Sequence, residues 1–183
     1  MGIALKQEIV KSQILTKLVG IIIFILLTIL GAYIYIPLPF TPVPITLQTF
    51  FVILSGAILG PHEGFLSQLG YLSLGALGLP VFSGCRGGII HLIGPTGGYL
   101  WGFLLSSWIV GKLTHKKKRN KFLLFIFFGC GILLIYLFGL LQLNLFIKKD
   151  LFTLFQLGIL PFLLPDLIKI LGAVLICERL KSK

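Results

Sequence analysis

The chain has 183 residues, of which 57% are hydrophobic and only 11% are charged. Its repeated apolar runs exceed what the core of a water-soluble protein of this size can hold, which excludes a soluble globular protein. Runs of Leu, Ile and Phe without two-residue alternation favour helices over a β-barrel. We therefore expect an all-α integral membrane protein in which residues 1–183 form a single membrane domain.

Six transmembrane helices are predicted, some close to the roughly 20 residues that cross a bilayer and others shorter. Their expected ranges are residues 19–36, 46–59, 65–79, 97–113, 122–147 and 161–177. The second and third helices flank the sequence GPHEG at residues 60–64, which predicts a turn. Residues 151–160 are apolar but too short to span, so we expect a re-entrant or surface-lying connection there.

Lys and Arg residues gather before the first helix, between the fourth and fifth, and after the sixth. The three groups are Lys6, Lys11 and Lys17; Lys112, Lys116, Lys117, Lys118, Arg119 and Lys121; and Arg179, Lys181 and Lys183. With six spans all three groups fall on one side, and positive loops mark the cytoplasmic side. We expect both termini in the cytoplasm. The net charge of +11 then reports topology and attraction to the lipid bilayer, and no nucleic acid partner is expected.

Two unusual loops share the outer face in this topology. Residues 37–46, PLPFTPVPIT, contain four prolines, which stiffen an extended segment. This segment is either packed over a cavity or a rigid surface turn. In the loop of residues 79–96, Gly84, Gly87 and Gly88 allow backbone N–H groups to approach a ligand closely. Glycines spaced four apart at the ends of the second and fourth helices favour tight helix packing.

Outside the cytoplasmic groups, Lys148 and Lys149 flank Asp150 in a loop and are expected to be solvated. Three other charged residues are candidates for a site near the outer face: Arg86 in the glycine-rich loop, and Asp166 and Lys169 in the last helix. Asp166 and Lys169 are three residues apart, so they occupy neighbouring positions on one helix face. A charge inside the hydrocarbon layer costs roughly 2.5–3.5 kcal/mol, and such charges are usually paired and functional. Either they bind a small, partly apolar ligand with N–H donors and an anionic group, or they form a private ion pair.

The sequence offers little for catalysis, metal binding or ATP hydrolysis. His62, His91 and His115 fall in different parts of the expected topology, so no two can share a metal. A site made of Ser83, His91 and Asp166 stays open, but no nucleophile elbow supports it. No phosphate-binding loop occurs, so pumping would need a partner. We expect no enzyme activity, no cofactor and no metal.

Four motifs in order resemble one family: PVPITLQT, GLPVFSGCRGG, GPTGGYLWGF and PFLLPDLIK. From about residue 38 to residue 176 the chain is similar to the BioY family, the biotin-binding S components of energy-coupling-factor (ECF) transporters. The resemblance implies biotin uptake into the cell through the plasma membrane. It also implies a transmembrane T component and two ATP-binding-cassette ATPases as partners, and an outward-facing cavity covered by ordered outer loops.

The same resemblance implies which residues bind biotin. Gln48 and Tyr71 are expected as polar contacts, residues 84–88 with Arg86 as the lid, and Asp166 with Lys169 as the charged anchor. Which cation takes the carboxylate of biotin stays open. The alternatives are an S component for another small vitamin, which shares the fold, and an integral membrane enzyme.

Overall fold

The computed structural model describes residues 2–115 and 120–181, and their side chains within residues 12–115 and 120–180. The basic residues Lys116, Lys117, Lys118, Arg119 and Lys183 lie outside the described residues, as do the side chains of Lys6, Lys11 and Lys181. In chain order the elements are α1 (Gly2–Tyr33), β1 (Tyr35–Ile36), β2 (Ile45–Thr46), α2 (Gln48–Leu59), α3 (Pro61–Ala76), α4 (Ile90–Ile93), α5 (Gly97–His115), α6 (Lys121–Ile147), α7 (Leu151–Gly158), the 3-10 helix η1 (Leu160–Phe162) and α8 (Leu163–Lys181).

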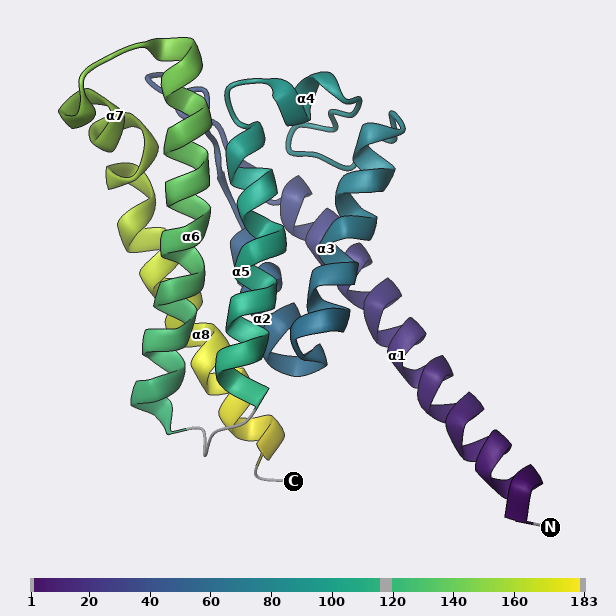
Figure 1. Ribbon diagram of the computed structural model, residues 1–183. Helices are drawn as coiled ribbons and strands as arrows, with labels where there is room; N and C mark the ends of the chain where they lie inside the picture. The colour runs from purple at the N-terminus through teal and green to yellow at the C-terminus, as the bar shows by residue number, and fades with distance from the viewer. Residues whose placement is uncertain (1, 116–119, 182–183) are drawn as a thin grey trace.

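The longer helices form a bundle from which the first half of α1 projects obliquely (Figure 1). Both described chain ends lie on the same side of the bundle, which we call the terminal end. The connections containing α4 and α7 lie on the opposite side, which we call the loop end. This arrangement agrees with an even number of passes between the two chain ends.

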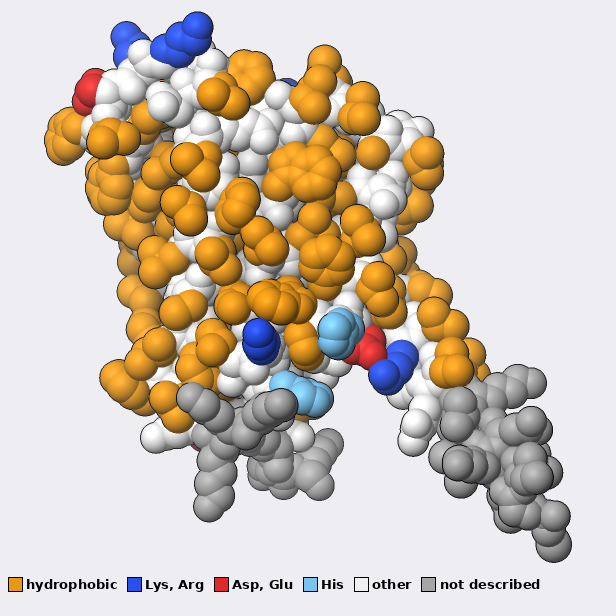
Figure 2. Space-filling view, in the orientation of Figure 1, with side chains coloured by type: hydrophobic (Ala, Val, Ile, Leu, Met, Phe, Trp, Pro, Cys, Tyr) orange, Lys and Arg blue, Asp and Glu red, His pale blue; other side chains and the backbone are white. Residues whose placement is uncertain are grey.

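Three segments among the described residues are long and apolar enough to cross a membrane: Ser12–Tyr33, Lys121–Ile147 and Leu151–Leu180. The helix α2, with 12 residues, measures only about 18 Å at about 1.5 Å per residue, less than the roughly 30 Å of a hydrocarbon core. Leu133 and Leu141 of α6 are 65% and 60% exposed. Apolar side chains likewise cover most of the surface visible in Figure 2, as expected for a protein surrounded by lipid.

The segment predicted as the end of the first helix is instead a short hairpin. α1 stops at Tyr33, and Tyr35 and Ile36 pair in antiparallel register with Thr46 and Ile45. The prediction of helix through residue 36 was wrong because Pro37 disfavours helical backbone at the residue before it. Residue 46, predicted as the start of the second helix, belongs to β2, and α2 begins at Gln48.

A turn was predicted at residues 60–64, but only Gly60 separates α2 from α3 in the structure. Gly60 has φ of 94°, and α3 starts at Pro61 rather than at residue 65, since the first helical position needs no N–H donor. The shortened connection brings α2 and α3 together. A Cβ on Gly64 would lie 2.9 Å from the Cα of Gly56, so these glycines permit close helix packing, as their spacing predicted.

The predicted start of the first helix at residue 19 was wrong, because α1 begins at Gly2 and continues well before the apolar run that predicted the span. The other predicted boundaries are closer to those observed. α5 starts at the predicted residue 97 and α6 ends at the predicted residue 147, whereas α3 stops at Ala76, three residues before the predicted end. The predicted connection at residues 151–160 contains α7, which is capped by Asp150: its carboxylate accepts hydrogen bonds from the Thr153 N–H and hydroxyl groups. α8 begins at Leu163 after η1, slightly later than predicted.

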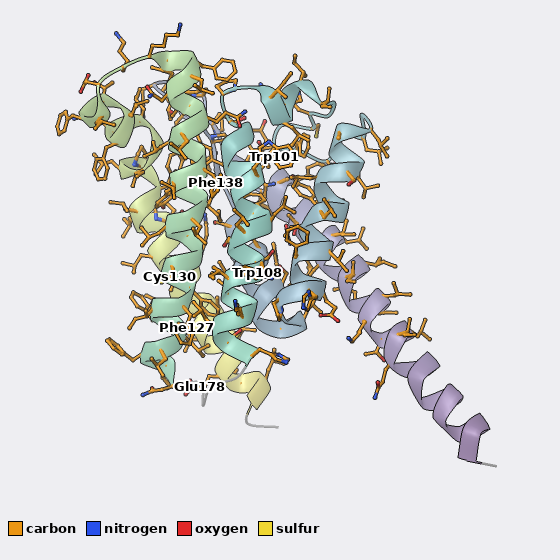
Figure 3. The ribbon with its side chains drawn as sticks, in the orientation of Figure 1. Trp101, Trp108, Phe127, Cys130, Phe138 and Glu178 are labelled. Carbon is orange, nitrogen blue, oxygen red and sulfur yellow. The ribbon has the colours of Figure 1, made fainter. Side chains whose placement is uncertain are left out.

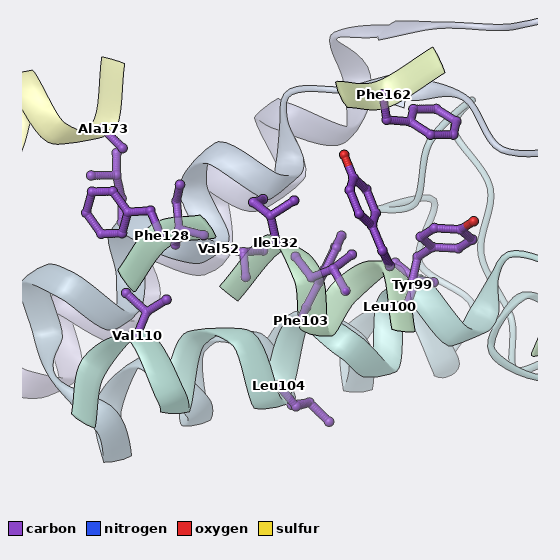
Figure 4. Close-up of a cluster of buried hydrophobic side chains, with 14 of the residues drawn as sticks. Val52, Tyr99, Leu100, Phe103, Leu104, Val110, Phe128, Ile132, Phe162 and Ala173 are labelled. Atoms are coloured by element: carbon purple, nitrogen blue, oxygen red, sulfur yellow. The ribbon is translucent and has the colours of Figure 1, made fainter. Parts of the chain in front are cut away.

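The core lies where α5 and α6 pack against α2 and α8, with Val52, Phe128 and Ile132 among its buried side chains (Figure 4). Glycine allows the contact between α5 and α6. A Cβ on Gly98 would lie 2.1 Å from the Phe138 carbonyl oxygen, a distance that no larger residue could accept without movement. Close approach of these two helices positions the side chains at their loop ends around a shared space.

Candidate functional site

A cavity of about 430 Å³ opens at the loop end. Its walls come from the β1–β2 hairpin and its proline-rich connection, the loop before α4, and helices α2, α5, α6 and α8. Prolines 37, 42 and 44 line the cavity, so the proline-rich segment forms part of its wall. The volume falls in the usual range for small-molecule sites.

Asp166 and Lys169 form an ion pair in the wall of this cavity. Lys169 Nζ lies 2.6 Å from Asp166 Oδ1, and the two side chains are only 10% and 5% exposed. The pairing predicted from their three-residue spacing on one helix is therefore confirmed. Asp166 stands in the first turn of α8, where the helix dipole favours a carboxylate.

Two hydroxyl groups from other helices complete the cluster. Thr49 of α2 donates a hydrogen bond to Asp166 Oδ1 (3.0 Å) and accepts one from Lys169 Nζ (3.0 Å). Tyr136 of α6 donates to Asp166 Oδ2 (2.5 Å). The pair is thus not private: it belongs to a four-residue network that joins α2, α6 and α8, and all four residues line the cavity.

Not every donor of Lys169 and acceptor position of Asp166 is used within this network. The Lys169 ammonium group has three N–H donors, of which Asp166 and Thr49 use two. A carboxylate has about four acceptor positions, and three hydrogen bonds reach Asp166. One donor on Lys169 and about one acceptor position on Asp166 Oδ2 therefore remain for a polar group in the cavity.

Gln48 and Tyr71 are joined in a chain of hydrogen bonds that ends at the backbone of Val81. The Gln48 amide nitrogen donates to the Tyr71 hydroxyl (2.6 Å), and that hydroxyl donates to the Val81 carbonyl (3.1 Å). Because the hydroxyl proton is used on Val81, Tyr71 can only accept from Gln48, so the Gln48 amide nitrogen faces Tyr71. Gln48 lines the cavity, whereas the fully buried Tyr71 lies behind it. No described residue donates to Gln48 Oε1, which leaves this acceptor for a ligand.

The glycine-rich loop contributes to the cavity from both of its halves, with His91 and Thr96 lining it in the second half. Gly84 and Arg86 line it, and Arg86 is held by paired backbone hydrogen bonds with Phe82 (2.9 and 3.3 Å). Gly87 and Gly88 lie outside the lining. The Gly88 N–H donates to the Gly75 carbonyl (2.7 Å), and a Cβ on Gly87 would lie 2.3 Å from the Leu79 carbonyl oxygen. These two glycines fasten the loop to the end of α3.

The structure does not assemble the catalytic site that the sequence left open. Ser83, His91 and Asp166 all line the cavity, but no hydrogen bond joins Ser83 to His91 or His91 to Asp166. Within the described parts of the chain, no group of three His, Cys, Asp or Glu side chains could hold a metal ion. The arrangement offers hydrogen-bonding groups to a ligand, and the described Ser83, His91 and Asp166 do not form a hydrogen-bonded triad.

Thr49 and Tyr136 were not predicted as site residues. Thr49 is the last residue of the motif PVPITLQT, directly after the predicted Gln48. Tyr136 is a lone phenol within the long apolar run of α6, and a polar side chain in such a run is a signal that could have drawn attention. Its partner Asp166 is 30 residues away, so only the tertiary structure brings the two together.

Comparison with known proteins places these features in a family. The sequence model described as the BioY family matches residues 5–183. The chain is 46% identical to the probable biotin transporter BioY of Pyrococcus horikoshii, covering 87% of this chain and 93% of the relative. It is 45% identical to the biotin transporter BioY of Thermotoga maritima, with 87% and 92% coverage.

A solved structure is similar over nearly the whole fold. It is a crystal structure of the S-component for biotin from an ECF-type ABC transporter, and it matches with a TM-score of 0.86 at 30% identity over 94% of each chain. The sequence matches and the fold match therefore agree, since both are to proteins described as biotin transporters or as a biotin S-component. From these matches we conclude that the chain belongs to the BioY family.

Proposed function

We propose that this protein is the biotin-binding S component of an ECF-type transporter and that it takes up biotin. The observation that carries the proposal is the network of Asp166, Lys169, Thr49 and Tyr136 in a cavity of about 430 Å³. Among the described residues it leaves one donor of Lys169 and about one acceptor position of Asp166 unused. The relatives named as biotin transporters support the choice of ligand.

The chemistry of biotin suits this cavity. Its ureido ring carries two N–H donors and one carbonyl acceptor, its sulfur ring is apolar, and its tail ends in a carboxylate. Asp166 accepts from a ureido N–H, Lys169 donates to the ureido carbonyl, and Gln48 Oε1 is positioned to accept from a further N–H group. The aromatic and aliphatic walls, such as Phe103 and Ile135, pack against the sulfur ring.

Arg86 is the better partner for the biotin carboxylate. The carboxylate would be repelled by the buried charge of Asp166 and would lose its hydration there. Arg86 lines the same cavity but is exposed to solvent, so the ion pair there keeps part of its water. In this assignment the neutral ureido ring lies deep in the cavity and the charged tail lies near the opening.

We also propose six membrane passes with both termini in the cytoplasm of the cell and the cavity facing outward across the plasma membrane. Both described chain ends lie at the terminal end (Figure 1), and the cavity is lined by residues of the loop end, which supports this topology. The basic residues at the predicted inner side agree with the positive-inside rule. The short helices α2 and α3, joined at Gly60, form a second and third pass together with the hairpin and loop that extend them.

Uptake against a gradient requires partners with ATPase activity. The sequence carries no phosphate-binding loop, and the solved relative is a component of an ECF-type ABC transporter. We therefore propose a transmembrane T component and two ATP-binding-cassette ATPases as partners. The chain itself supplies binding and release.

Titration of the detergent-purified chain with labelled biotin tests the proposal. We expect saturation near one biotin per chain without ATP and without a partner, since every proposed contact comes from this chain. Unlabelled biotin should displace the label, whereas thiamine and riboflavin should not. Absence of binding, or equal displacement by another vitamin, would overturn the assignment to biotin.

A further inference from the structure

A second cavity lies on the outside of the bundle near the terminal end, between α3 and α5. It has a volume of about 440 Å³ and is lined by His62, Phe65 and Leu66 of α3 and by Leu105 and Trp108 of α5. We call it the α3–α5 groove. Apart from His62 its lining is apolar, and Leu66 is 47% exposed. It is separate from the cavity at the loop end and shares no lining residue with it.

A cation stands at one end of this groove. Lys112 follows Trp108 by one helical turn, and its ammonium group lies 4.8 Å from the centre of the Trp108 ring. Among the described residues no carboxylate pairs with Lys112. Glu63, the neighbour of His62, is paired with Lys17 at 2.6 Å. Figure 2 shows Lys and His side chains gathered at this level, directly beside the apolar surface.

We propose that the α3–α5 groove binds an anionic phospholipid. The phosphate would lie beside Lys112, and one acyl chain would lie against Phe65, Leu66 and Trp108. Trp and Lys are residues that occur together at the level of lipid head groups, and an unpaired Lys at an apolar groove complements a negative head group attached to a hydrocarbon chain. A soluble phosphate would gain nothing from the apolar lining, and a neutral lipid would leave Lys112 without its counter-charge.

The two tryptophans of the chain provide a built-in test. Trp108 lies in the groove, whereas Trp101 lies nearer the loop end of the same helix (Figure 3) and donates a hydrogen bond to the Leu92 carbonyl. The variant Trp101→Phe therefore leaves Trp108 as the only tryptophan, and Trp108→Phe leaves Trp101. Each variant is reconstituted into phosphatidylcholine vesicles that contain brominated phosphatidylglycerol or, at equal mole fraction, brominated phosphatidylcholine. Bromine quenches the fluorescence of a tryptophan that it contacts.

We expect Trp108 to show a relative binding constant about fivefold higher for phosphatidylglycerol than for phosphatidylcholine, the scale of one basic side chain at an anionic surface. Adding Lys112→Gln to the Trp101→Phe variant should abolish this preference. The control Lys121→Gln removes a cation that is paired with Glu178 on the other side of the bundle, and it should leave the preference intact. Trp101 should show no preference.

Several results would overturn the proposal. Equal quenching of Trp108 by the two lipids, or no quenching by either, would mean that the groove does not select an anionic lipid. A preference that survives Lys112→Gln, or that appears equally at Trp101, would reflect the net charge of the protein. Relief of the quenching by glycerol phosphate would point to a soluble anion. Biotin saturation of the Lys112→Gln variant serves as the check that it is folded.

Discussion

Removing the charges of Asp166 and Lys169, singly and together, should weaken binding in all three variants but lower stability mainly in the two single variants. The changes are Asp166→Asn, Lys169→Met and the double variant. Each residue would lose a charge-assisted hydrogen bond to biotin, which is worth about 1.5–3 kcal/mol. The dissociation constant should therefore rise about 10- to 150-fold in each single variant. The double variant should bind no better than the weaker single variant, because both ligand contacts are gone.

The free energy of unfolding should fall in both single variants and recover in the double variant. The two side chains are only 10% and 5% exposed, so either single change leaves a buried charge without its partner. Breaking a buried ion pair in this way costs about 3–5 kcal/mol, whereas removing both charges is often nearly neutral. The double variant should thus be more stable than either single variant. A private ion pair would give this same recovery in stability, but it would leave binding nearly unchanged.

Labelled-biotin titration and thermal denaturation in the same detergent measure the two quantities. A matched control is the surface pair of Lys121 and Glu178, which are 3.0 Å apart and whose side chains are 65% and 41% exposed. Changing them to Met and Gln should leave biotin affinity unaltered and cost less than about 1 kcal/mol in stability. If the folded double variant of Asp166 and Lys169 binds biotin like the parent, the reasoning is refuted.

Three further predictions concern the rest of the site and its orientation. Arg86→Ala should weaken binding of biotin about tenfold or more but hardly change binding of biotin amide, because the amide lacks the charge that Arg86 is proposed to hold; equal losses in calorimetric titrations would reassign the carboxylate. Tyr71→Phe should lower biotin affinity about fivefold, since it removes the one acceptor that the described residues provide for the Gln48 amide; an unchanged affinity would show that Gln48 is not oriented by Tyr71. A membrane-impermeant thiol reagent should modify the exposed Cys85 in intact cells and miss a cysteine placed at Lys117, and the reverse result would invert the topology.

Much of the fold follows from local sequence. The long apolar run of α6 and the start of α5 at Gly97 were predicted to within a residue, because hydrophobicity and turn residues act over short windows. The hairpin of Tyr35–Ile36 with Ile45–Thr46 was not, since its hydrogen-bond partners lie across a proline-rich connection that reads as irregular. The single-residue turn at Gly60 was missed because Pro61 reads equally well as a turn residue and as a first helical residue.

In the candidate site, too, some contacts follow from local sequence and others depend on tertiary packing. By itself the sequence determined the ion pair of Asp166 and Lys169, because residues three apart on a helix are neighbours whatever surrounds them. Only the tertiary structure decided that Thr49 and Tyr136 complete the network, and that Tyr71 lies behind Gln48 rather than in the cavity. These contacts depend on how closely α2, α6 and α8 approach one another. That approach is set by long-range packing, and no local pattern in the chain encodes it.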